Sequence, residues 1–266
     1  MKVLGQLRKM DVEVQSPIAY FLSLDKKSYP LNQHIGESIS LKWAGTITCI
    51  ECGRKTRKSY DQGYCFPCSR DLPGNAMCSV RPELCEHEKG NEADQEFWRT
   101  HCKIDHFVYL SLTSGVKVGI TRHYNIPDRW IDQGAVKGLI IAKVPERVLS
   151  GQIEVAIAKD FADKTNWRKM LKGEVAEVDL LTFRDKAQEL FPPGLKKYAV
   201  KDGQVEELVY PVESVPEKIS SHNLDKIPEF TDRLTGIKGQ YLIFERRVIN
   251  MRKYGGYHVE FDFQDR

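Results

Sequence analysis

Long hydrophobic runs are missing from this sequence. No stretch approaches the roughly 18 consecutive apolar residues that a membrane-spanning helix needs. The opening residues, MKVLGQLRKMDVEV, also lack an apolar run of signal-peptide length. We therefore expect a cytoplasmic protein without a membrane partner.

Glycine-rich phosphate loops are missing as well. The sequence has no Walker-type loop and no G-x-G-x-x-G motif, and the short GITR segment at residues 119–122 cannot cradle a dinucleotide. These absences argue against nucleotide-dependent enzymes of the P-loop and Rossmann classes.

A strong excess of either charge is the third absence. Forty Lys and Arg residues stand against 37 Asp and Glu residues, which gives a net charge of +3. This balance neither requires nor excludes a nucleic-acid partner, because such binding needs only a local basic surface. With 266 residues and 41% hydrophobic content, the chain is long enough for one large unit or two to three small ones.

Cysteine is absent outside residues 49–102, where all seven cysteines occur. In a chain without a signal sequence, this crowding favours metal binding over disulfides. Cys49-x2-Cys52 and Cys65-x2-Cys68 have the spacing of two zinc knuckles, and Gly53 and Gly63 allow the positive φ that such turns need. The pattern predicts one structural Zn²⁺ in a zinc-ribbon-like module.

A second metal site is predicted from four residues further along: Cys78, Cys85, His87 and Cys102. Their spacing follows no standard knuckle, and His101 and His106 are alternative ligands. The competing interpretation is that Cys78 and Cys85 are simply buried thiols.

The residues between the two knuckles are strongly basic. A nucleic-acid-binding role is predicted for Arg54, Lys55, Arg57 and Lys58. A solvated hairpin without a ligand is the alternative.

Strand-like pieces lie at both ends of the chain. Val3–Leu7, Ile18–Leu24 and Ile39–Trp43 precede the cysteines, and three further pieces follow residue 239. We expect the two ends to fold together into one small β unit, with Gly255-Gly256 as a hairpin turn in a C-terminal meander. Two independent β pieces are the alternative.

The central stretch FVYLSLTSGVKVGITRHYNIPDRW, residues 107–130, has the pattern of a strand, a turn, a second strand and a helix. A strand at 138–144 and helices at 145–161, 165–171 and about 176–190 follow. The fold class is therefore α+β. We divide the chain into four segments: 1–48, 49–104, 105–204 and 205–266.

Residues of this stretch resemble the GIY-YIG nuclease superfamily. Tyr109, the triplet Lys117-Val118-Gly119 followed by Ile120-Thr121, and Arg129 carry the likeness, which covers about residues 105–172. It implies a ββαβα module and metal-dependent cleavage of a phosphodiester. A larger part of the sequence, including RWIDQGA, DKTNWRKML and GIKGQYLI, is similar to an uncharacterised bacterial family known as a domain of unknown function.

The superfamily resemblance implies roles for individual residues. Tyr109 would act as general base or position the water, Arg129 would stabilise the phosphate, and Glu154 would hold Mg²⁺ or Mn²⁺. Asn166 would be the later polar residue of the site. Lys117 replaces the second motif tyrosine, so the tyrosine pair is absent, and Lys117 with Arg122 would instead contact phosphate.

Three functions remain open at this point. The chain is a metal-dependent nuclease, a DNA- or RNA-binding protein that has lost catalysis, or a zinc-stabilised scaffold for other proteins. In each interpretation the cysteines hold structural zinc.

Overall fold

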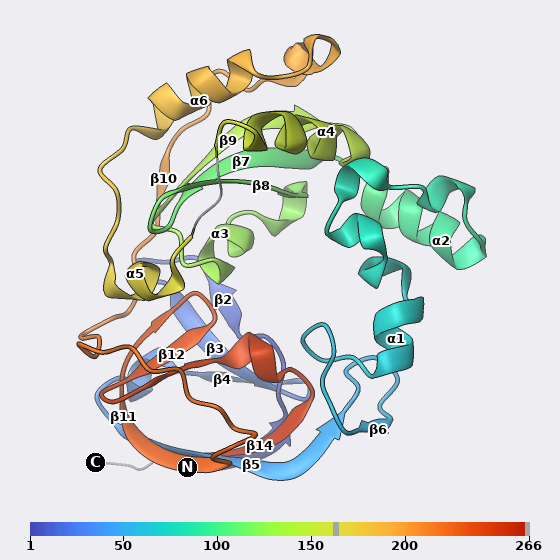
Figure 1. Ribbon diagram of the computed structural model, residues 1–266. Helices are drawn as coiled ribbons and strands as arrows, with labels where there is room; N and C mark the ends of the chain where they lie inside the picture. The colour runs from blue at the N-terminus through green and yellow to red at the C-terminus, as the bar shows by residue number, and fades with distance from the viewer. Residues whose placement is uncertain (162–164, 264–266) are drawn as a thin grey trace. The chain divides into compact units, whose positions relative to one another are not determined.

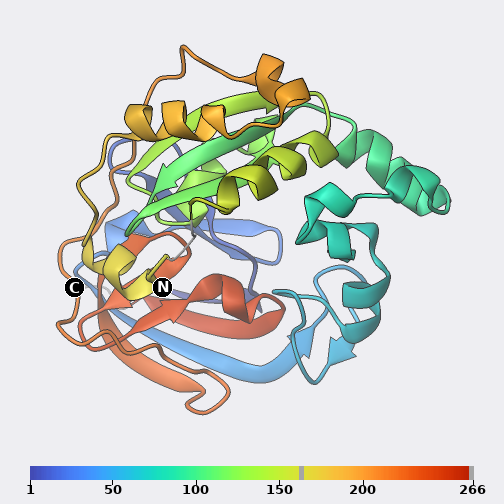
Figure 2. The same ribbon diagram turned by 45° about the horizontal axis from the view of Figure 1, so that its top comes forward.

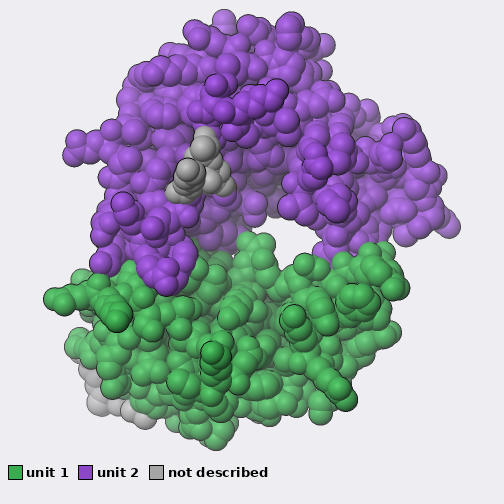
Figure 3. Space-filling view, viewed as in Figure 1, with its two compact units in different colours: residues 1–71, 209–266 green, residues 72–208 purple. Residues whose placement is uncertain are grey.

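The computed structural model describes residues 1–161 and 165–263. These residues form two compact units, Met1–Asp71 with Val209–Arg266 and Leu72–Leu208, which are coloured separately in Figure 3. The first cysteine cluster falls in the unit that contains both chain ends, and the second falls in the other unit. The division into four segments stays a prediction.

The strands of the first unit are β1 (Lys2–Gln6), β2 (Asp11–Glu13), β3 (Ala19–Leu24), β4 (Lys27–Pro30), β5 (Ser38–Thr48), β6 (Lys55–Thr56), β11 (Glu229–Lys238), β12 (Tyr241–Phe244), β13 (Val248–Asn250) and β14 (Tyr257–Phe263). Its α-helix is α1 (Phe66–Asp71). In the second unit lie β7 (His106–Leu112), β8 (Val116–Arg122), β9 (Lys137–Val144), β10 (Glu206–Glu207), α2 (Glu92–Phe97), α3 (Asp128–Asp132), α4 (Arg147–Ala158), α5 (Trp167–Lys172) and α6 (Leu180–Glu189).

The two ends of the chain pair in one sheet, as expected. Its strand order is β1-β14-β5-β11-β12-β13, with β6 added to β5, and β2-β3-β4 form a separate antiparallel sheet (Figure 1). Side chains of β14 alternate strictly, so that Tyr257, Val259, Phe261 and Phe263 are buried. This period of two places one face of the strand in the core.

The predicted hairpin turn at Gly255-Gly256 is wrong. Strand β13 pairs with β12, whereas β14 pairs with β1 and β5. Between β13 and β14 a 3-10 turn, Met251–Tyr254, buries its first and last side chains in the core. Gly256 has a φ of +87°, and a Cβ there would lie 2.6 Å from the Thr48 carbonyl oxygen. The glycines therefore allow close backbone packing rather than a hairpin.

The second unit contains the strand, strand, helix, strand, helix, helix order that we expected from residue 106 onward. Strand β7 pairs antiparallel with β8 on one side and β9 on the other, in the sheet order β10-β9-β7-β8. The turn at Thr113–Gly115 closes the β7–β8 hairpin through a Thr113 N–H donated to the Gly115 carbonyl at 3.1 Å. Kinship with the GIY-YIG nucleases does not follow from this order and stays a prediction.

The two faces of this sheet have different coverings. Val108, Leu110 and Leu112 belong to an apolar cluster that includes Ile153 and Ile157 of α4. Leu180 and Ala187 of α6 complete this side, and Figure 2 shows α4 and α6 along it. The alternate residues of β7 point to the opposite face, where α3 lies. Sheet pleating therefore separates an apolar core from a face that carries polar groups.

Within the part of the chain that the structure describes, no helix combines the length and apolar character needed to cross a bilayer.

Candidate metal centres and polar site

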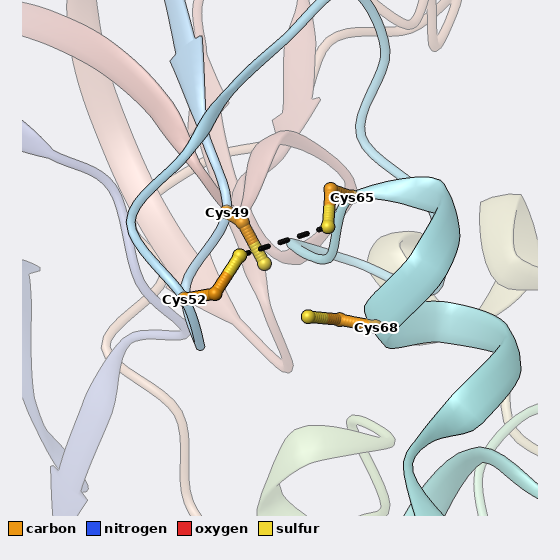
Figure 4. A group of neighbouring side chains, drawn as sticks. All are labelled: Cys49, Cys52, Cys65 and Cys68. Atoms are coloured by element: carbon orange, nitrogen blue, oxygen red, sulfur yellow. Dashed lines mark hydrogen bonds between the residues drawn. The ribbon is translucent and has the colours of Figure 1, made fainter.

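The first cluster brings together four cysteine sulfurs. The Sγ atoms of Cys49, Cys52, Cys65 and Cys68 all lie within 4.8 Å of one another, and Cys52 Sγ is 3.7 Å from Cys65 Sγ. Four sulfurs bound tetrahedrally at about 2.3 Å from zinc would be about 3.8 Å apart. Figure 4 shows the sulfurs converging from the end of β5 and from the start of α1. The cluster has the geometry of a zinc site.

Local backbone structure explains why the cysteines converge. The Gly53 N–H donates to the Cys49 carbonyl at 3.1 Å, and the Ile50 N–H donates to the Gly63 carbonyl at 2.9 Å. Gly53 and Gly63 have φ values of +72° and +145°, which favour glycine, as the knuckle pattern predicts. The second pair then enters α1, where the Ser69 N–H donates to the Cys65 carbonyl.

The pKa values of these thiols are shifted in different directions. Burial raises the pKa of Cys49, but backbone N–H groups of Cys52, Cys65 and Glu51 outweigh it and lower the value to about 6. Burial and hydrogen bonds from the other cysteines raise the pKa of Cys68 to about 12. A cation among the sulfurs would relieve this mutual repulsion between thiolates.

The second cluster also has metal-binding geometry. Ligand atoms of Cys78, Cys85 and His87 lie within 4.8 Å of one another, and His87 Nδ1 is 3.5 Å from Cys78 Sγ and 3.6 Å from Cys85 Sγ. Cys102 Sγ is 3.7 Å from Cys85 Sγ and 3.9 Å from His87 Nδ1. The structure therefore brings all four predicted residues together.

Asp94 also lies beside this cluster, although the sequence did not indicate it. Asp94 Oδ1 lies 3.8 Å from His87 Nε2, which is also 3.9 Å from Cys78 Sγ. A carboxylate behind a ligating histidine fixes the orientation of its ring. Asp94 Oδ2 also accepts the Asn91 N–H in the capping box of α2. The capping pattern was the signal in the sequence, but the proximity to His87 was not.

Tyr109 lies on the polar face of the sheet. It is completely buried, and its hydroxyl donates to Gln133 Oε1 at 3.3 Å. Its ring stands edge-on to Trp130 of α3, with centroids 6.0 Å apart. Burial raises the pKa of the Tyr109 hydroxyl, while the nearby charge of Arg129 lowers it. Gln133 is a partner that sequence reasoning missed, because it follows the end of α3 by only one residue and carries no motif.

Arg129 is half-buried at the start of α3. Among the residues that the structure describes, its Nε is buried without a hydrogen-bond partner. A buried N–H that lacks an acceptor costs about 1–3 kcal/mol, so such atoms commonly mark the position of a ligand or an ordered water.

Glu154 is half-buried on α4, and its electrostatic neighbours include two other predicted residues. Burial raises the pKa of this carboxyl to about 6, and the positive charges of Lys117 and Arg129 oppose that rise. Glu154 also raises the pKa of Tyr109. Tyr109, Lys117, Arg129 and Glu154 therefore form one electrostatically linked group.

Asn166 has a structural task at the start of α5. Its side-chain oxygen accepts the Arg168 and Lys169 N–H groups at 3.0 Å and 3.3 Å, and its own N–H donates to Ser114 Oγ. These contacts are those of a helix N-cap.

The predicted nucleic-acid-binding residues lie at the surface or are half-buried. All four basic residues of the knuckle hairpin, Arg54, Lys55, Arg57 and Lys58, are exposed. Lys58 Nζ lies 5.4 Å from the centroid of the Tyr60 ring. In the other unit, Arg122 is half-buried and donates to the hydroxyl of the exposed Tyr124 at 2.8 Å.

A comparison with known protein families covers most of the chain. A family model described as "Protein of unknown function (DUF2797)" matches residues 36–259. The chain belongs to this family. The matched range contains both clusters of candidate metal ligands and the group around Tyr109. Searches of curated proteins and of solved structures gave no significant match.

Proposed function

We propose that this protein hydrolyses phosphodiester bonds in DNA or RNA, with zinc in both cysteine clusters as structural support. The observation that carries the proposal is the buried, unpartnered Nε of Arg129 within the group that also contains Tyr109, Lys117 and Glu154. A phosphate oxygen is a suitable acceptor for a guanidinium N–H, and two positive charges suit an anionic substrate.

The residues would divide the work as follows. Arg129 would hold non-bridging oxygens and stabilise the charge that develops on them. Lys117 would add a second positive charge at the position where the GIY-YIG motif has a tyrosine. Tyr109 is completely buried with a raised pKa, which favours orienting Gln133 and Arg129 over accepting a proton.

Glu154 would hold a divalent cation. Mg²⁺ and Mn²⁺ accept carboxylate ligands, and Mg²⁺ in particular keeps several waters and needs few protein ligands, so the half-buried carboxylate of Glu154 fits this role. When bound, the cation supplies neutralisation of charge on the scissile phosphate. Glu154 would bind the cation in its ionised form, which predominates above its pKa of about 6.

The test is a cleavage assay with labelled single-stranded, duplex and branched DNA and RNA in Mg²⁺ or Mn²⁺. We expect the parent to cut at least one substrate, Glu154→Gln to lose at least about 100-fold in rate, and the exposed control Glu177→Gln to match the parent. Because the active form of Glu154 is ionised, the parent rate should rise with pH through about 6.

Binding without cleavage is the second candidate function. The absence of the motif's second tyrosine at Lys117 and the exposed basic hairpin favour it. Under this alternative, the parent retains a nucleic acid in a salt-sensitive manner without cutting it, and Glu154→Gln leaves the affinity unchanged. Absence of both cutting and retention would contradict either form of the proposal and leave a zinc-stabilised scaffold.

A further inference from the structure

The loop between Cys78 and Cys85 lies directly against α4. Its 3-10 turn, Pro82–Leu84, contacts the helix at Gly151, which is buried. A Cβ at Gly151 would lie 2.5 Å from the Glu83 backbone nitrogen and 2.9 Å from the Pro82 carbonyl carbon. Only glycine allows this approach, because the atoms in the way belong to the backbone and cannot rotate aside.

Two further contacts join the same helix to residues beside the metal ligands. Arg147 Nη2 donates to the carbonyl of Ser79, the neighbour of Cys78, at 3.2 Å. Lys103, the neighbour of Cys102, forms an ion pair with Glu146 at 2.9 Å, just before the first turn of α4. Figure 1 shows part of the teal chain between α1 and α2 beside the start of α4.

These contacts occupy the helix face that carries Glu154. Arg147, Gly151 and Glu154 are separated by four and three residues, so their side chains lie above one another on one face. Glu83 of the loop is close enough for its charge to act on Glu154. The position of the loop therefore affects the surroundings of the candidate metal ligand.

The loop has little else to hold its shape. It consists of short 3-10 turns, and although Pro82 is buried, the larger apolar side chains Val80 and Leu84 are 79% and 49% exposed. A segment with so few buried apolar contacts has low local stability. A metal held by Cys78, Cys85, His87 and Cys102 would therefore be a strong anchor for it.

We propose that zinc binding by Cys78, Cys85, His87 and Cys102 fixes the loop against α4 and thereby positions Glu154. Gly151 and Arg147 are the positioning residues. The role of Glu154 rests on the proposed function, but the coupling between the metal and α4 does not. A structural metal in this unit would then control whether the Glu154 site is formed.

The experiment compares hydrogen exchange in the full-length parent and two single-cysteine variants, without any nucleic acid. Cys85→Ser removes a ligand of the second cluster, and Cys52→Ser is the matched control in the first cluster. Native mass spectrometry confirms the loss of one zinc in each. We expect exchange of amides 147–154 to be about tenfold faster in Cys85→Ser and unchanged in Cys52→Ser.

A second variant separates loop contact from helix stability. Gly151→Ala keeps every metal ligand and raises intrinsic helix propensity, which by itself would slow exchange in α4. The proposed contact predicts the opposite, because the added Cβ displaces the loop and speeds exchange. The pKa of Glu154, measured by NMR titration of its carboxyl carbon, should also change in this variant.

Unchanged exchange at residues 147–154 in a zinc-depleted Cys85→Ser protein, or slower exchange in Gly151→Ala, would overturn the coupling. If Cys85→Ser unfolds the whole unit, Gly151→Ala decides alone. Since neither measurement uses a substrate, failure of the coupling is distinct from failure of the nuclease proposal.

Discussion

At the scale of single residues, Gly119 makes the position of Tyr109 possible. The two residues face each other in the β7–β8 ladder. A Cβ at Gly119 would lie 2.5 Å from the Tyr109 hydroxyl oxygen and 2.6 Å from Cζ of its ring. The tyrosine therefore lies across β8, where any larger residue than glycine would displace it. The glycine of the VGIT segment is explained by this contact, whatever the protein's activity.

Gly119→Ala is expected to destabilise the protein by about 1–3 kcal/mol, because the fully buried Tyr109 cannot move without disturbing Trp130. Urea unfolding measures the change. Gly115→Ala is the matched control in the adjoining turn, since a Cβ there meets nothing within 4 Å. Equal stabilities of the two variants would show that Tyr109 has room to shift.

At the scale of elements, the segment that carries the two knuckles has little regular structure of its own. Strand β6 has two residues and α1 has six, and α1 has no buried residue. Elements this short are not stable alone. The pairing of β6 with β5 holds part of this segment, and a metal bound by the four sulfurs would hold the rest.

Native mass spectrometry of the parent should show two bound zinc ions, one for each cluster. Cys52→Ser should retain one zinc and lose the structure around β6 and α1, because three thiolates with one exposed replacement bind zinc less tightly. Far-ultraviolet circular dichroism and the rate of proteolysis between residues 50 and 71 would measure that loss of structure. A parent that carries no zinc, or a variant that keeps both ions, would contradict this prediction.

At the scale of the whole molecule, the nearly balanced net charge conceals a local concentration of basic residues. Exposed Arg54, Lys55, Arg57 and Lys58 occupy four of five consecutive positions in a chain whose net charge is only +3. Binding of a polyanion depends on such local density, because each phosphate contact releases counterions. Overall composition therefore says little about nucleic-acid binding by this protein.

Replacement of Lys55, Arg57 and Lys58 by Gln should weaken retention of a labelled oligonucleotide and reduce the salt dependence. The slope of log affinity against log salt is expected to fall by about 2–3, since each lost contact accounts for roughly 0.7–0.9. Arg54 is left in place because its side chain interacts with Cys52. Fluorescence anisotropy at several salt concentrations gives the slope.

The control for this experiment removes the same charge elsewhere. Lys26, Lys218 and Lys226 are exposed lysines outside the knuckle hairpin, and their replacement by Gln should leave the slope nearly unchanged. Equal losses in the two triple variants would mean that general charge, and not the hairpin, attracts the nucleic acid.

The sequence by itself determined those features that depend on nearby residues. The two Cys-x2-Cys pairs, with glycines at positive φ, and the order of elements from β7 to α5 were predictable because turns, caps and periodicity are local. The grouping of Cys78, Cys85, His87 and Cys102 was also predictable, although their spacing is irregular, whereas their role as metal ligands stays a prediction.

Only the tertiary structure decided which distant segments meet. Strand β11 went unpredicted because charged residues and Gly236 interrupt its pattern, yet it pairs with β5 nearly 200 positions away. The prediction of a hairpin turn at Gly255-Gly256 also failed because of a distant contact. Gly256 packs against the backbone at Thr48, which is far away in the sequence. The approach of Asp94 to His87 and of the loop to Gly151 likewise depends on packing between elements. Such contacts arise from long-range burial and strand pairing, which no local pattern encodes.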